Sequence, residues 1–174
     1  FVGNYFWTHY FYNLLGAKYT METYRINNVP YLMFLATQAY FTFYHSMINV
    51  VLRVFYSVWP KPSKLRFITV SLLIFALAVF TAYMETFTIQ EFPYYTHKDK
   101  FLMYTVGSVF YSLYFVVSFP MFFRMDEDPK DKWPISRVII DSLGAAMAVT
   151  ILLDFWRLIV GGIVTDVPEC VPFM

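Results

Sequence analysis

The sequence contains few charged residues: Asp, Glu, Lys and Arg make up only 14% of its 174 residues, against roughly 25% in a typical soluble domain. The formal net charge is +1 and there is no run of lysines or arginines, so nothing in the chain suggests nucleic-acid binding. The single cysteine, Cys170, excludes an internal disulfide and a cysteine metal cluster. The three histidines have unrelated spacings, so we predict no metal and no other cofactor.

Apolar side chains are abundant instead, with 59% hydrophobic and 22% aromatic residues. A helix needs roughly 20 apolar residues to cross the hydrocarbon core of a bilayer, and several stretches reach that length. We therefore predict an all-α, polytopic transmembrane helix bundle with four complete spans and one partial N-terminal span. It forms a single transmembrane helical domain over residues 1–174, with helices at about 2–19, 30–53, 66–90, 101–124 and 134–160. The sequence starts at Phe1, which is neither an initiator Met nor the start of a signal-peptide pattern. We therefore expect this sequence to be the C-terminal part of a longer chain.

One carboxylate interrupts the most apolar of these stretches. Glu85 is the only charged side chain between Phe67 and Thr88. A charge inside a bilayer is costly, so we expect this side chain to face the protein interior, to pair with a cation or to keep its proton. The residues alone leave two roles open, a catalytic acid or a salt bridge to Arg157 that joins two helices.

The other spans also carry polar residues at helical spacing. In 30–53 they recur at three- and four-residue steps: Gln38, Thr42, His45, Asn49 and Arg53. This pattern predicts a helix face turned toward protein rather than lipid. In the last span, Asp154 and Arg157 are three residues apart, which predicts a structural ion pair. Gly144 and Ala148 have the spacing of small residues that allows membrane helices to approach closely.

Several sequence blocks, in consistent order from about Gly3 to Arg157, resemble the cycloeucalenol cycloisomerase family: NYFWTHYF at 4–11, NNVP at 27–30, AYMET at 82–86, FPYY at 92–95, VSFPMFFRMDE at 117–127, and DSLGAAM followed by ILLDFWR at 141–157. Members of that family are polytopic proteins of the endoplasmic reticulum membrane that open the cyclopropane ring of cycloeucalenol to give obtusifoliol. The resemblance therefore implies a sterol isomerase whose partners are a sterol or other lipid and the membrane. The alternative location is another organelle membrane, such as the mitochondrial inner membrane.

The implied reaction requires an acid that protonates the cyclopropane and a base that then removes a different proton to form an alkene. On this interpretation Glu85 is the acid, or the carboxylate that faces the cation, and His45 is the partner that carries the second proton. Further aromatic side chains are predicted to bind the substrate and to shield its positive charge with their ring faces: Trp7, His9, Tyr44, Tyr83, Tyr104 and Tyr111.

Two other interpretations remain open. The chain could be a non-catalytic member of the same family that acts as a structural or lipid-binding accessory subunit of a larger membrane complex. This alternative is favoured by Tyr31 and Gln38, which stand where the plant pattern has histidines, and by the family's upstream spans, which this chain lacks. A channel or transporter is less favoured, because the polar residues are too scattered for a continuous ion path.

Overall fold

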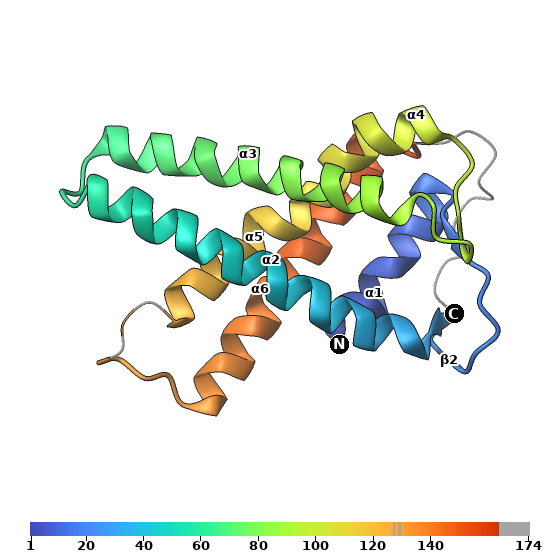
Figure 1. Cartoon of the computed structure of the whole chain (residues 1–174), viewed down its shortest axis with the longest axis horizontal. Helices are drawn as coiled ribbons and strands as arrows, with labels where there is room; N and C mark the ends of the chain where they lie inside the picture. The colour runs from blue at the N-terminus through green and yellow to red at the C-terminus, as the bar shows by residue number, and fades with distance from the viewer. Residues whose placement is uncertain (127, 129, 164–174) are drawn as a thin grey trace.

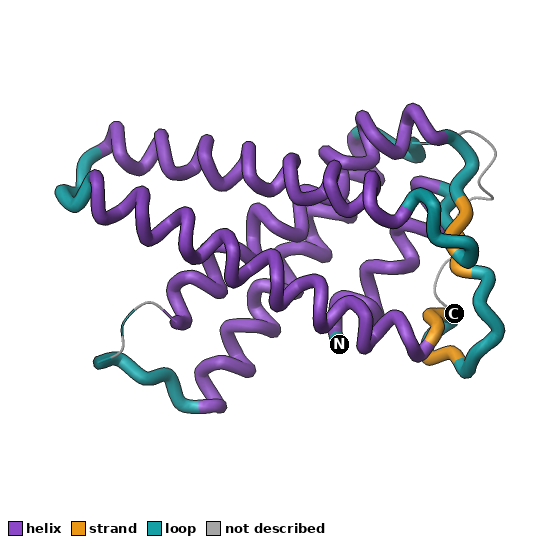
Figure 2. Tube along the Cα trace, viewed as in Figure 1, coloured by secondary structure: helices purple, strands orange, loops and turns teal. Residues whose placement is uncertain are grey.

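The computed structural model describes residues 1–126, 128 and 130–163, so Cys170 and Glu127 of the last resemblance block at 117–127 lie outside it. Most of the described chain is helical (Figure 2). The helical elements are α1 (Val2–Tyr10), the π-helical η1 (Phe11–Leu15), α2 (Tyr31–Val58), α3 (Lys64–Ile89), α4 (Lys100–Leu102), the π-helical η2 (Met103–Gly107), α5 (Ser108–Asp126) and α6 (Ile135–Ile159). The predicted all-α fold is confirmed, apart from four two-residue strands.

Three helical stretches are long and apolar enough to cross a membrane: Lys64–Ile89, Lys100–Met125 and Ile135–Ile159. The second of them comprises α4, η2 and α5, which continue one another. These stretches confirm a helical membrane protein. Helix α2 is longer, with 28 residues, but it is more polar and is not among the three.

Helix α5 is at the centre of the bundle. It packs against α2, α3 and α6, while α1 lies against α6. Figure 1 shows α2 and α3 running side by side, with α5 and α6 crossing beneath them. The largest fully buried side chains of α5 are Phe110, Phe115 and Phe119. The outer sides of α3 and α6 expose apolar residues such as Phe67 and Ile140, as expected where helices face lipid.

The first helix ends earlier than predicted. The sequence predicted a helix over 2–19, whereas the helical region stops at Leu15. The physical reason is Gly16, whose φ of 64° is in the left-handed region and closes the helix. The chain then forms β1 (Lys18–Tyr19), which pairs antiparallel with β4 (Tyr95–Thr96).

The segment NNVP contains a tight turn as well as a helix start. Asn27 and Asn28 both have positive φ, 48° and 62°, and they link β2 (Arg25–Ile26) to β3 (Val29–Pro30) as a two-residue antiparallel hairpin. Helix α2 begins directly afterwards, with Pro30 at its N-cap. The turn thereby fixes where α2 enters the bundle.

Gly16→Ala is expected to destabilise the protein by roughly 1–2 kcal/mol, because a Cβ is unfavourable in the left-handed conformation. The new Cβ would also lie 3.1 Å from side-chain carbons of Lys98. Thermal unfolding in detergent measures the effect.

Gly144→Ala is the matched control. A Cβ at Gly144 meets nothing within 4 Å among the described residues, so the close helix approach expected there from the sequence is not found. Because Gly144 is inside α6, its replacement by Ala is expected to leave stability unchanged or to raise it by up to about 1 kcal/mol. Equal losses for both variants would contradict this account of Gly16.

Candidate functional site

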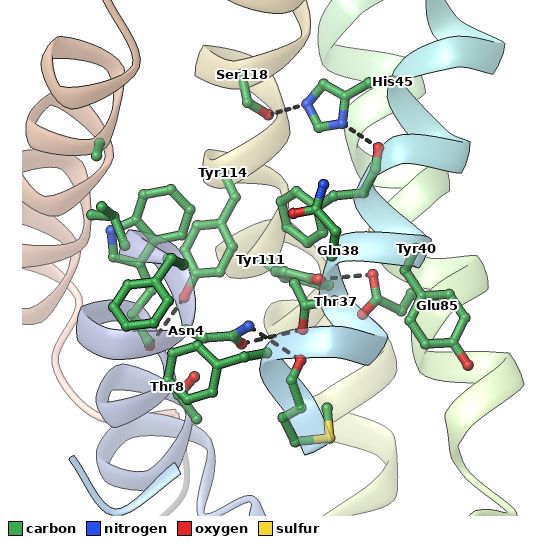
Figure 3. Close-up of a pocket in the computed structure, with 18 of the residues that line it drawn as sticks. Asn4, Thr8, Thr37, Gln38, Tyr40, His45, Glu85, Tyr111, Tyr114 and Ser118 are labelled. Atoms are coloured by element: carbon green, nitrogen blue, oxygen red, sulfur yellow. Dashed lines mark hydrogen bonds between the residues drawn. The ribbon is translucent and has the colours of Figure 1, made fainter. Parts of the chain in front are cut away.

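A cavity of about 540 Å³ lies between the helices of the bundle and is partly open to the outside, where exposed residues such as Phe1 and Ile139 line it. Small-molecule sites in proteins typically measure roughly 300–1,000 Å³. Its walls come mainly from α1, α2, α3, η2, α5 and α6, with single residues from η1, β1 and β4, and most of the lining side chains are apolar or aromatic. Polar groups are concentrated at a few points of the wall, of which two are built on α5 (Figure 3).

The first polar centre is Glu85, which lies near the C-terminal end of α3 and lines the cavity. The buried side of α3, with Ala82 and Thr86, turns this part of the helix toward the interior. The hydroxyl of Tyr111 on α5 donates a hydrogen bond of 2.7 Å to Oε2 of Glu85. The phenol of Tyr44 lies close to the same carboxyl group. Glu85 is therefore surrounded by phenols and apolar groups.

Arg157, the cationic residue that could have paired with Glu85, pairs with a different acid. Nη2 of Arg157 is 3.6 Å from Oδ1 of Asp154, within α6. The hydroxyl of Tyr10 donates a further hydrogen bond, of 3.3 Å, to the same oxygen. Among the described residues no salt bridge joins Arg157 to Glu85, so the structure does not contain the interhelical salt bridge considered from the sequence.

The second polar centre is the pair of His45 on α2 and Ser118 on α5. Nδ1 of His45 lies 2.6 Å from the carbonyl oxygen of Phe41, so Nδ1 carries the hydrogen and donates it. Nε2, 2.9 Å from Oγ of Ser118, is then an acceptor, and the Ser118 hydroxyl donates to it. Both residues line the cavity, and both are otherwise buried.

The two polar centres lie at different levels of one helix. Tyr111, which holds Glu85, and Ser118, which holds His45, are seven residues apart on α5. Seven residues are two turns, so both side chains are on the same face of α5, separated by roughly 10 Å of helical rise. Figure 3 shows the His45–Ser118 pair and the Glu85–Tyr111 pair as separate groups on the cavity wall.

Two tyrosines outside the spans complete the surroundings of Glu85. Tyr19 and Tyr95 line the cavity from the paired strands β1 and β4, with ring centroids 5.1 Å apart. Burial raises the pKa of both phenols. Both phenols therefore remain neutral and add no charge beside Glu85.

Only some of the aromatic residues predicted to bind the substrate line the cavity. Trp7 and Tyr111 line the cavity, whereas His9, Tyr44, Tyr83 and Tyr104 are not among its lining residues. Tyr44 stacks on Tyr40, and the rings of Tyr83 and Tyr104 pack together 5.2 Å apart.

Of the two positions that depart from the family pattern, Gln38 lines the cavity and Tyr31 is half exposed at the start of α2.

Sequence reasoning did not select Ser118 or Asn4. Asn4 on α1 donates to the carbonyl oxygen of Met33 over 3.2 Å, and its own oxygen accepts from the Thr37 hydroxyl at 3.2 Å. The spacing of Ser118 from Tyr111, two turns on one helix, is a signal that the sequence contained. No such signal pointed to Asn4, because its partners are on another helix.

A curated protein of Arabidopsis thaliana named "cycloeucalenol cycloisomerase" is 52% identical to this chain over 170 residues. The matched region is 97% of this chain and 60% of the relative, so the chain spans less than two thirds of the relative's length. No family model matches the chain, and no solved structure matches it. Half of the residues of this chain are identical to those of the relative over nearly the whole length of this chain, so the chain is similar to a cycloeucalenol cycloisomerase throughout this region.

Proposed function

We propose that this protein is a sterol isomerase that opens the 9,19-cyclopropane ring of a cyclopropyl sterol, as in the conversion of cycloeucalenol to obtusifoliol. The observation that carries the proposal is the Glu85 carboxyl group, which lines an apolar cavity of 540 Å³ and is held by Tyr111. The name of the Arabidopsis thaliana relative supports the same substrate class. We place the protein in the endoplasmic reticulum membrane, where such sterols are made.

Glu85 supplies the proton in this mechanism. An ionised carboxylate is unfavourable among apolar groups, so the carboxyl group enters the reaction with its proton. The proton passes to the cyclopropane methylene carbon, and the electrons of one ring C–C bond form the new C–H bond. That carbon becomes a methyl group and the neighbouring ring carbon becomes a cation.

The cation is then quenched by loss of a proton from an adjacent carbon, whose C–H electrons form the alkene. His45, which the sequence suggested for this step, is held about two turns of α5 away from Tyr111. The carboxylate that remains at Glu85 is already beside the cation, so we propose that Glu85 accepts the second proton. This return restores the starting carboxyl group, and the overall isomerisation neither consumes nor releases protons.

The aromatic wall protects the cation. Trp7, Tyr111 and Tyr114 line the cavity, and the rings of Trp7 and Tyr114 are 4.8 Å apart. Ring faces attract a cation by roughly 0.5–2 kcal/mol each where water is excluded. We expect a bound sterol, which fills much of this partly open cavity, to exclude water from the cation.

The test is to express the full-length protein that contains this chain in sterol-auxotrophic cells, feed cycloeucalenol and analyse the sterols. The proposal predicts a ring-opened product with an alkene. Sterol binding without conversion by a well-folded protein would refute it and would favour the accessory-subunit alternative.

Tyr111→Phe is expected to lower the turnover of the full-length protein by about two- to tenfold. The substitution removes the hydroxyl that orients Glu85, and one such hydrogen bond contributes roughly 0.5–1.5 kcal/mol. Steady-state conversion in membranes measures the effect. Tyr83→Phe removes a hydroxyl from a half-exposed tyrosine outside the cavity and should leave turnover unchanged. If the two variants behave alike, Tyr111 does not position Glu85.

A further inference from the structure

The pair of His45 and Ser118 has no role in the mechanism above, although burying two polar side chains costs free energy. Both side chains are buried inside the bundle, with 6% and 8% of their surfaces exposed, and both line the cavity. Polar groups at such depth in a membrane protein usually bind something or transfer protons. We therefore expect a polar group of a ligand to bind this pair from within the cavity.

The hydrogen-bond inventory of the pair shows which group fits. Nδ1 of His45 is occupied by the carbonyl oxygen of Phe41, and Nε2 accepts from Ser118. The Ser118 oxygen keeps lone pairs, and the structure shows no donor for them among the described residues. The pair can thus accept a hydrogen bond from a neutral hydroxyl group, and it carries no charge that would attract an ion.

The separation of Tyr111 and Ser118 along α5 is of the same order as the distance between the hydroxyl group and the cyclopropane of a sterol. The hydroxyl oxygen of a sterol lies across the first ring from the cyclopropane, about five bonds or roughly 5 Å away. A contact of about 3 Å at each end brings the distance between the two protein groups to roughly 10 Å. The rise along α5 between the backbone positions of Tyr111 and Ser118 is of the same order, roughly 10 Å.

We propose that His45 and Ser118 form the subsite for the substrate's hydroxyl group, which fixes the sterol with its cyclopropane against Glu85. This assignment rests on the proposed function and specifies how the substrate lies in the cavity. Ser118 contacts the hydroxyl, and His45 positions Ser118 by accepting its hydrogen.

The test compares two substrates, cycloeucalenol and its 3-deoxy analogue, in the full-length protein. A buried site that hydrogen-bonds a hydroxyl discriminates strongly against an analogue without it, so the wild type should prefer cycloeucalenol by roughly 30-fold or more in kcat/KM. Ser118→Ala should lower kcat/KM for cycloeucalenol by about tenfold or more and change that for the analogue less than about twofold. Ser118→Thr, which retains a hydroxyl, should recover most of the preference.

Ser112→Ala is the matched control. Ser112 is buried on the same helix, but its hydroxyl donates to the carbonyl oxygen of Val109, 2.6 Å away, and it does not line the cavity. Its removal should leave the substrate preference intact. If Ser118→Ala slows both substrates equally, or neither, the hydroxyl subsite is refuted. If the wild type converts neither sterol, the proposed function itself fails.

Discussion

Glu85→Gln is expected to lower conversion of cycloeucalenol by the full-length protein by roughly 10²–10⁴-fold, the usual contribution of a positioned acid. The amide has nearly the same size as the carboxyl group, and its oxygen can still accept the hydrogen bond from Tyr111. It has no acidic proton to give to the cyclopropane. The measurement is the ratio of product to unreacted sterol in membranes with equal amounts of each protein.

Asp154→Asn is the control for this variant. Asp154 is also an acid within a membrane-length helix, but it pairs with Arg157 and does not line the cavity. Its replacement should change conversion by no more than a few fold. Wild-type conversion by Glu85→Gln would remove Glu85 from the reaction.

Phe115→Ala is expected to have the largest effect on stability, about 3–5 kcal/mol, the usual cost of deleting a buried phenylalanine ring. Phe115 is fully buried at the centre of α5. Its ring lies 5.4 Å from Phe41, 5.0 Å from Tyr111 and 5.1 Å from Phe119. The deletion therefore leaves a void between α2 and α5 and removes the support of the tyrosine that holds Glu85. Unfolding in detergent measures the loss.

Phe80→Ala provides the comparison on α3. Phe80 is 60% exposed and faces away from the core, so its deletion leaves no internal void. We expect a change within about 1 kcal/mol. A similar loss for both phenylalanines would show that packing around α5 does not dominate the stability of the bundle.

Apolar length allowed most helices to be predicted from the sequence. The ranges expected for the later helices, such as 66–90 and 134–160, lie close to Lys64–Ile89 and Ile135–Ile159. One exception is the first helix, because the apolar pattern continues through Gly16 while the backbone there turns left-handed. The other is the second helix, which was predicted to end at residue 53 whereas α2 continues to Val58. Hydropathy indicates whether a side chain is favourable in lipid. It does not detect a backbone conformation, such as that of Gly16, that ends the helix.

The candidate site was only partly predictable, for a physical reason. A lone carboxylate in an apolar stretch must be compensated, which drew attention to Glu85. The identity of the compensating group depends on how helices far apart in the sequence face one another. Arg157 was a reasonable partner by charge, yet the structure places Tyr111 beside Glu85 and leaves Arg157 with Asp154. For the same reason the sequence did not indicate which tyrosines line the cavity. Tyr83 and Tyr104 were predicted to bind the substrate, but they lie outside the cavity.

The most direct test of the central claim is a structure of the full-length Glu85→Gln protein with bound cycloeucalenol, since this variant should hold the sterol unreacted. We predict that the sterol fills the cavity with its cyclopropane methylene at roughly 3–3.5 Å from the side chain at position 85, the separation of reacting atoms before a transfer. Its hydroxyl should meet Ser118. A sterol bound outside the cavity, or one whose cyclopropane lies far from position 85, would contradict the assignment of Glu85 as the acid.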